Sequence, residues 1–256
     1  MSGASAPRVF ITGASSGIGA ALAREYAARG AILGLTARRR ELLDQMAGSL
    51  KTTVSIYPLD VRDVDALRDA AADFIQRYGP PDVVIANAGV SAGTLTEEAD
   101  DLPVFQEIMD VNVMGMVNTF HAFLPKMHTR NSGTLVGIAS VASARGLPGA
   151  SAYSASKAAA LRYLESLRVE LYGSGVRVTT ICPGYIKTAM TAENPYPMPF
   201  ILDVDEAARR FVRAIDAQKS LVTIPWQMGV VRYLLRRLPN WLFDAAFSRA
   251  GRKPRR

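Results

Sequence analysis

The chain is poor in cysteine and histidine and has no long uninterrupted apolar run. Cys182 is the single cysteine among 256 residues, which excludes an intramolecular disulfide, and His121 and His128 have no cysteine or carboxylate at metal-ligand spacing beside them. Glycines and serines interrupt the first twenty residues, and no charge-free stretch reaches the roughly 18 residues of a bilayer span. The sequence therefore predicts no metal site, no membrane span and a soluble protein of a reducing, cytoplasmic compartment.

A basic excess is confined to one part of the sequence. The formal net charge is +7, yet residues 1–228 hold 22 Lys and Arg against 22 Asp and Glu, whereas residues 229–256 hold 8 against 1. A nucleic-acid groove needs a basic stripe on the body of the protein, so we expect no nucleic-acid partner. The basic tail predicts a local attachment, partner-binding or solubilising segment.

Short β-branched apolar runs alternate with segments of helical periodicity along most of the chain. The predicted strands are residues 9–12, 31–36, 53–57, 83–86, 134–140 and 176–182, with 221–224 as a seventh. The predicted helices are residues 17–29, 39–50, 63–78, 104–128, 152–173 and 204–218. This order predicts an α/β fold, a doubly wound parallel sheet of the Rossmann type with six to seven strands and helices on both faces. We expect one domain over residues 1–225 and a helical C-terminal extension over residues 226–256.

Two segments break the alternation. Residues 184–203 are rich in proline, methionine and aromatic side chains, which is typical of a lid or binding loop. Residues 226–250 contain two helical patterns that meet at Pro239, with both tryptophans and several leucines beside arginines. They predict a helical cap on the substrate pocket, a subunit contact, or a peripheral contact with a membrane. The apolar character of both segments favours an apolar, lipid-like substrate.

A glycine-rich turn follows the first predicted strand. Gly13 permits a tight turn, Gly17 lets the backbone approach a pyrophosphate, and Gly19 lets the following helix pack on the strand. Backbone N–H groups at the start of that helix are free to bind an anion. The spacing differs from the commoner dinucleotide fingerprint, and a glycine-rich turn without any ligand is the alternative.

The end of the second predicted strand bears on the choice of dinucleotide. An acidic residue is usual there for binding the adenosine ribose, but this sequence has Arg38, Arg39 and Arg40. A guanidinium such as that of Arg38 can bind a 2′-phosphate, a contact that contributes about 1.5–3 kcal/mol. The sequence therefore favours NADP(H), with NAD(H) as the alternative.

A tyrosine, a lysine and a serine can meet at the carboxyl edge of the predicted sheet. Tyr153 and Lys157 are four residues apart and so share one face of a helix, and Ser140 ends a predicted strand. A tyrosine needs its pKa lowered by roughly 3 units to exchange protons near neutral pH, and one nearby ammonium can supply about that much. Taken alone, a tyrosine four residues before a lysine is more often a surface pair.

These motifs together resemble the short-chain dehydrogenase/reductase family over about residues 7–190. The matching motifs are the turn from Thr12 to Gly19, Asn87-Ala88-Gly89 after the fourth strand, and Tyr153 to Lys157. The resemblance implies a catalytic tetrad of Asn112, Ser140, Tyr153 and Lys157. It also implies a set of cofactor-binding residues: Gly13, Ser15, Ser16, Gly17, Ile18, Gly19, Arg38, Asp60, Val61, Asn87, Ala88, Gly89, Tyr153, Lys157, Pro183, Gly184, Ile186 and Thr188.

The resemblance implies a role for each member of the tetrad. Tyr153 would donate a proton to a carbonyl oxygen, and Ser140 would hydrogen-bond the same oxygen. Lys157 would lower the pKa of Tyr153 and bind the nicotinamide ribose, and Asn112 would anchor a water that relays protons to Lys157. The implied substrate is a small-molecule carbonyl or alcohol. The implied assembly is a homodimer, built from the helices 104–128 and 152–173, or a homotetramer.

The sequence thus predicts an NADP(H)-dependent oxidoreductase that interconverts a carbonyl and a secondary alcohol. Two alternatives remain, an NAD-preferring alcohol dehydrogenase of the same family and a non-catalytic nucleotide-binding scaffold that binds a partner through its basic tail. The complete tetrad argues against the scaffold, because a scaffold has no need of a proton donor.

Overall fold

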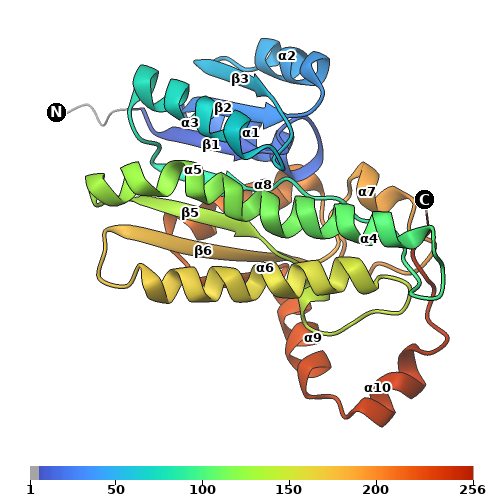
Figure 1. Cartoon of the computed structure of the whole chain (residues 1–256). Helices are drawn as coiled ribbons and strands as arrows, with labels where there is room; N and C mark the ends of the chain where they lie inside the picture. The colour runs from blue at the N-terminus through green and yellow to red at the C-terminus, as the bar shows by residue number, and fades with distance from the viewer. Residues whose placement is uncertain (1–5, 256) are drawn as a thin grey trace.

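The computed structural model describes residues 6–255 and contains one seven-stranded parallel sheet (Figure 1). The strands lie in the order β3-β2-β1-β4-β5-β6-β7, and every pairing is parallel. Their bounds are β1 Arg8–Thr12, β2 Ile32–Ala37, β3 Val54–Pro58, β4 Val83–Ala86, β5 Gly133–Ile138, β6 Val176–Pro183 and β7 Leu221–Ile224. The predicted Rossmann-type sheet is confirmed, with the seventh strand included.

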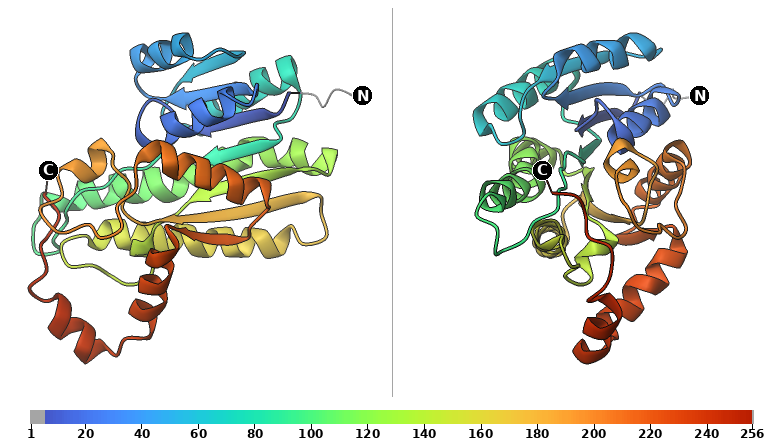
Figure 2. Two further views of the ribbon diagram at one scale, coloured as in Figure 1. Left: turned by 180° about the vertical axis from the view of Figure 1, so that it is seen from behind. Right: turned by 90° about the vertical axis from the view of Figure 1, so that its right-hand side faces the viewer.

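Helices cover both faces of the sheet, as the views in Figure 2 show. Their bounds are α1 Gly17–Ala27, α2 Arg40–Ser49, α3 Val64–Tyr78, α4 Asp101–Met109, α5 Gly115–Arg130, α6 Ser151–Glu170, α7 Ala189–Ala192, α8 Val204–Asp216, α9 Trp226–Arg237 and α10 Asn240–Phe247. Side chains alternate along each strand, so Val9 and Ile11 pack with α1 and α8, whereas Phe10 packs with α3 and α5. The two layers of core hold the sheet between them.

The long helix predicted over residues 104–128 is interrupted. A π-helical turn, η1 (Asp110–Met114), lies between α4 and α5 and contains the buried Asn112. A π turn adds one residue per turn and is frequent at functional sites. Sequence periodicity does not reveal this insertion, because the residues on either side keep their helical pattern.

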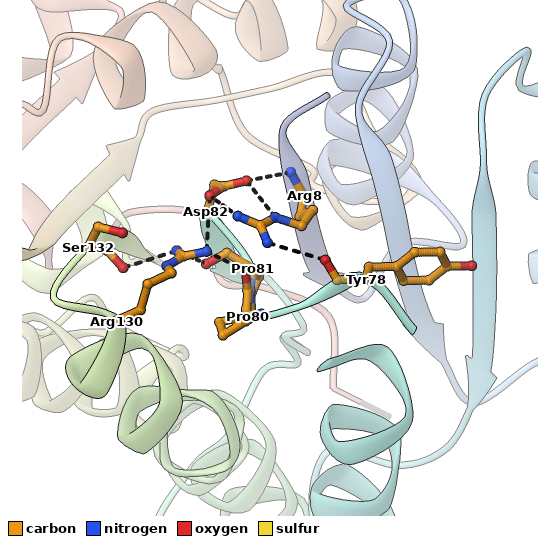
Figure 3. Close-up of polar contacts among 7 residues, drawn as sticks. All are labelled: Arg8, Tyr78, Pro80, Pro81, Asp82, Arg130 and Ser132. Atoms are coloured by element: carbon orange, nitrogen blue, oxygen red, sulfur yellow. Dashed lines mark hydrogen bonds and ion pairs between the residues drawn. The ribbon is translucent and has the colours of Figure 1, made fainter. Parts of the chain in front are cut away.

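An ion-pair cluster fastens the amino ends of the strands, at the edge away from the predicted site (Figure 3). The Asp82 carboxylate accepts hydrogen bonds from the backbone N–H and the guanidinium of Arg8, and it lies 3.1 Å from the Arg130 guanidinium. Burial raises the pKa of Asp82, but the hydrogen bonds from Arg8 outweigh it and leave the pKa below its usual value. The cluster ties β1, β4 and α5 together where no chemistry is expected.

Candidate active site

The glycine-rich turn has a backbone that only glycine adopts readily. Gly13 has φ +67° and Gly17 has φ +54°, and a Cβ on Gly13 would lie 2.8 Å from Ala88 Cα. Asn87 holds the turn from the next strand, since its Nδ2 donates to the carbonyl oxygens of Thr12 (2.9 Å) and Gly13 (3.2 Å). The side chain of Ser16, at the N-cap of α1, makes no capping hydrogen bond. The first N–H groups of α1 therefore stay available to an anion.

A cavity of about 350 Å³ lies at the carboxyl ends of the strands, beside this turn. The order of the strands reverses between β1 and β4, which is where doubly wound sheets bind ligands. Every cofactor-binding residue predicted from the sequence lines this cavity except Gly19, which is buried behind the turn. Sequence reasoning missed ten lining residues: Ala37, Arg39, Leu59, Val90, Val111, Ile138, Ala139, Ala189, Met190 and Thr191.

Two arginines and one aspartate line the part of the cavity next to β2 and β3. Arg38 and Arg39 follow the end of β2, and the Arg38 side chain is 59% exposed, with its guanidinium 4.0 Å from the Glu107 carboxylate. Asp60 follows β3, and hydrogen bonds from Arg62 hold its pKa below the usual value despite partial burial. The two arginines therefore place positive charge at the end of the cavity where a dinucleotide would place its adenosine ribose.

Tyr153 and Lys157 lie one turn apart on α6 and both line the cavity. Tyr153 is half-buried and Lys157 is buried. The Lys157 Nζ donates a 2.8 Å hydrogen bond to the Ile138 carbonyl and lies 5.9 Å from the centre of the Tyr153 ring. The two groups therefore share the site, but the ammonium lies beside the ring and is anchored to the end of β5.

Burial shifts the pKa values of both groups, and the lowering of the Tyr153 pKa by Lys157 stays a prediction. Burial raises the pKa of the Tyr153 phenol, and a hydrogen bond with Ser140 opposes part of that rise. Burial lowers the pKa of Lys157 to about 8. In this geometry, the hydrogen bond with Ser140 favours ionisation of the phenol.

Lys157 should make the stability of the protein depend on pH. Its pKa is about 8 when folded and 10.5 when unfolded, so the cost of burying the charge is full below pH 8 and falls as pH rises towards 10.5. Between pH 7.5 and pH 9.5, the free energy of unfolding of the parent should therefore rise by about 1–2 kcal/mol relative to that of the Lys157→Met variant. Urea denaturation at both pH values measures this, with the exposed Lys51→Met as control. An equal difference at both pH values would contradict the low pKa.

Ser140 lies two residues beyond the end of β5, not at its last position as predicted. Its backbone is extended, and its Oγ accepts a 3.1 Å hydrogen bond from the backbone N–H of Ala142, which starts a single 3₁₀ turn, η2 (Val141–Ser143). Because Oγ is the acceptor in this bond, its own hydrogen is the one that Ser140 can donate, and the Tyr153 phenol is its partner in this structure.

Asn112 does not line the cavity but lies directly behind it. Its Oδ1 accepts from the Val90 N–H at 2.8 Å, and its Nδ2 donates to the Val90 carbonyl and to Ser156 Oγ. A Cβ on Gly89 would lie 3.1 Å from Asn112 Oδ1 and 3.5 Å from Lys157 Nζ. Asn112 therefore fixes the loop after β4 against α6, and Ser156, a residue that sequence reasoning missed, is its partner.

Residues 251–255, named here the C-terminal strap, bridge loops around the catalytic end of the sheet. The Gly93 N–H donates a 2.7 Å hydrogen bond to the Pro254 carbonyl, and Gly251 packs on the Tyr196 side chain. The Arg255 guanidinium lies 2.9 Å from the Asp101 carboxylate, which is buried, and 3.1 Å from Glu98. The strap therefore connects the loop after β4 and the start of α4 with the loop after β6.

Two further sequence expectations concern metals and membranes. Within residues 6–255, no group of three or more histidine, cysteine, aspartate and glutamate side chains could hold a metal ion. Both histidines are exposed on α5. Among the described helices, none has both the length and the apolar character needed to cross a bilayer.

Comparison with known proteins agrees with this geometry. Residues 7–197 match the family described as short chain dehydrogenase. A protein of Myxococcus xanthus named "uncharacterized oxidoreductase" is 42% identical over 245 residues, covering 94% of this chain and 96% of the relative. The Arabidopsis thaliana protein named 11-beta-hydroxysteroid dehydrogenase-like 3 is 37% identical over 227 residues, covering 85% of this chain and 72% of the relative.

A solved structure has the same fold. A short chain dehydrogenase from Burkholderia cenocepacia, in complex with NADP, superposes with a TM-score of 0.82 at 29% identity, covering 94% of this chain and 97% of that one. The chain belongs to the short-chain dehydrogenase/reductase family of oxidoreductases.

Proposed function

We propose that this protein is an NADP(H)-dependent oxidoreductase that interconverts a ketone or aldehyde with its alcohol. The observation that carries the proposal is that Ser140, Tyr153 and Lys157 line one cavity together with the glycine turn. A dinucleotide fits this cavity chemically, because the N–H groups at the start of α1 can bind its phosphates and the absence of a Cβ at Gly13 lets the turn lie close against Ala88. The nicotinamide would then be bound by Pro183, Gly184, Ile186 and Thr188, at the end of the cavity opposite to Arg38.

The side chains supply a proton and position the reacting carbonyl. Tyr153 Oη donates its proton to the carbonyl oxygen, and the Ser140 hydroxyl donates a hydrogen bond to the same oxygen. A nicotinamide cofactor, when bound, would supply the hydride for the carbonyl carbon: its own C–H bond and the Tyr153 O–H bond would break as the new C–H and O–H bonds form and the C=O π bond is lost. Lys157 keeps two N–H donors besides the one that binds Ile138, and these serve the ribose hydroxyls and the reprotonation of Tyr153.

The preference for NADP(H) over NAD(H) is proposed from the charges next to β2. Arg38 and Arg39 both line the cavity, and no carboxylate follows β2 to accept the ribose hydroxyls. A 2′-phosphate would make charge-assisted hydrogen bonds with these guanidinium groups, whereas the ribose of NAD(H) would add no anion to the Glu107 carboxylate that already lies 4.0 Å from Arg38.

The substrate is proposed to be apolar. The nicotinamide end of the cavity is bordered by Ala139, Val90 and Met190, and the loop that carries Met190 continues to Tyr196, on which the C-terminal strap packs. These side chains offer dispersion contacts and few hydrogen-bonding groups. A ketone with a large apolar body would gain from them, whereas a small polar ketone would lose hydration without compensation.

A substrate panel tests the proposed function. NADPH oxidation by the purified protein should be faster with long-chain or polycyclic ketones than with small polar ones, since only the former bury apolar surface in the cavity. The readout is kcat/KM from NADPH absorbance. The same panel with NADH supplies the cofactor comparison. Efficient reduction of small polar ketones alone would contradict the apolar substrate, and failure with every carbonyl and alcohol would contradict the activity.

The assembly is proposed to be a homodimer or homotetramer formed through α5 and α6. Large apolar side chains lie exposed near these helices, namely Met114 at 49%, Val169 at 61% and Tyr172 at 88%. Burying such side chains against a second copy is favourable.

A further inference from the structure

Helix α9 exposes a stripe of large apolar side chains. Trp226, Val230, Tyr233 and Leu234 follow the spacing i, i+4, i+7, i+8 and are 69%, 50%, 56% and 57% exposed. This spacing puts all four on one face of the helix. Single exposed apolar residues are ordinary, but a contiguous stripe marks a surface that another partner covers.

The opposite face of α9 is already packed, so the helix cannot turn its stripe inward. Met228 is buried against Gly184, where an added Cβ would lie 2.6 Å from Met228 Cγ. The Arg145 guanidinium donates a 2.9 Å hydrogen bond to the Leu238 carbonyl at the end of the helix. The orientation of the stripe towards solvent is therefore fixed by contacts within the fold.

Helix α10 continues this exposed surface beyond the end of α9. Phe243 is buried under the Arg145 guanidinium, which lies 4.2 Å from its ring centre, whereas Trp241 is 72% and Leu242 40% exposed. In Figures 1 and 2, α9 and α10 project from the body of the protein at the β7 side of the sheet. Both tryptophans of the chain thus lie exposed on this projection.

Positive charge surrounds the stripe. A surface hollow on α9 is lined by Arg232, Tyr233, Arg236 and Arg237, and the Arg237 guanidinium lies 3.7 Å from the centre of the Tyr233 ring. Helices α9 and α10 contain three arginines, Arg232, Arg236 and Arg237, and one acidic residue, Asp244, so they carry a net charge of +2. Facing two copies of this segment towards each other would bring these like charges together. An anionic surface would instead be attracted.

We propose that α9 and α10 dock the protein onto an anionic lipid bilayer. Tryptophan and tyrosine prefer the boundary between headgroups and acyl chains, where the ring is apolar and its N–H or O–H stays hydrated. The arginines beside them meet the acidic headgroups. The helices lie on the membrane rather than cross it, because their exposed apolar face is only one side of each helix. This docking surface is separate from the cavity that holds Tyr153.

Intrinsic fluorescence tests the proposal in the intact protein, because Trp226 and Trp241 are the only tryptophans. Vesicles of phosphatidylcholine with phosphatidylglycerol should shift the emission to shorter wavelength and sediment with the protein, whereas pure phosphatidylcholine vesicles should do neither. An absence of shift and of co-sedimentation with the anionic vesicles overturns the proposal. If the tryptophan emission shifts to shorter wavelength when the protein concentration is raised in the absence of vesicles, the proposal is overturned, because a second copy of the protein then covers the stripe.

Paired variants separate the contributions of charge and apolar surface. Arg236→Glu with Arg237→Glu should weaken partitioning at least ~25-fold, since each basic residue near an anionic leaflet contributes about fivefold. The control reverses two exposed arginines four residues apart on α8, Arg209→Glu with Arg213→Glu, and should weaken partitioning less. Equal losses of vesicle partitioning in the two double variants would show that net charge alone determines binding, and would overturn the proposed docking surface.

The apolar variants keep both tryptophans as probes. Val230→Ser with Leu234→Ser should lower vesicle partitioning by more than tenfold, because two large side chains no longer enter the apolar layer. The matched control is Val64→Ser with Leu102→Ser, which removes an exposed valine and an exposed leucine from α3 and α4 and should leave partitioning unchanged. NADPH titration reports whether each variant is folded. Equal partitioning of the two pairs of variants overturns the role of the stripe.

Discussion

Replacing Tyr153 with phenylalanine is expected to lower kcat for carbonyl reduction by about 10²–10⁴-fold, the range that a positioned general acid contributes. The change removes one hydroxyl from the cavity and keeps the ring that packs beside Lys157. The affinity for NADPH should stay nearly unchanged, because the phenol serves the substrate oxygen. Single-turnover absorbance and fluorescence titration with NADPH measure the two quantities separately.

A second tyrosine on the same helix provides the control. Tyr163 lies ten residues further along α6, is half-buried and stacks with Phe120 at 6.3 Å between ring centres. Tyr163→Phe removes the same hydroxyl away from the cavity and should leave kcat unchanged. If Tyr153→Phe retained full turnover, the proton would have to come from another group and the proposed mechanism would be wrong.

Replacing Arg38 with aspartate is expected to reverse the preference between the two dinucleotides. Loss of a charge-assisted contact with the 2′-phosphate should weaken NADP(H) binding about 10–100-fold, and the new carboxylate should accept hydrogen bonds from the ribose hydroxyls of NAD(H). Dissociation constants from nucleotide fluorescence titration, for both reduced cofactors, measure the change. Arg39 also lines the cavity, so some affinity for NADP(H) should persist in the single variant.

Arg40→Asp is the matched control for this charge reversal. Arg40 is 69% exposed, pairs with Asp44 at 3.7 Å on α2 and does not line the cavity. Its replacement should weaken NADP(H) binding much less than the change at Arg38. Equal effects of the two substitutions would mean that net charge alone attracts the nucleotide, and equal affinity of the parent for both cofactors would contradict the assignment of Arg38.

The parts of the fold predicted correctly are those that depend on local pattern. The strands β1, β2 and β4 came from apolar runs within one residue of their observed bounds, and the turn at Gly13 came from the backbone freedom that its chemistry requires. The position of Ser140 was predicted as the end of a strand, but the 3₁₀ turn after β5 places it two residues further on. A single turn of this kind leaves no period in the sequence.

The parts that the sequence could not reveal are contacts between residues far apart in the chain. Arg255 pairs with Asp101 across 154 residues, and nothing in either local sequence points to the other. The hydrogen bond of Lys157 to the Ile138 carbonyl has the same character, because a backbone acceptor carries no sequence signal. The expected influence of Lys157 on the Tyr153 pKa depended on distance and orientation, which only the folded geometry supplies.

The C-terminal strap has a consequence for how molecules reach Tyr153. It is held by the Arg255 ion pairs with the partly exposed Glu98 and the buried Asp101, by hydrogen bonds from Lys253 to Met190 and Asn194, and by one backbone hydrogen bond at Gly93. Releasing these few contacts would expose much less buried surface than disturbing a parallel sheet between two layers of helices. Releasing five residues would therefore free the loop that carries Met190, a residue of the cavity wall, while the parallel strands keep their register.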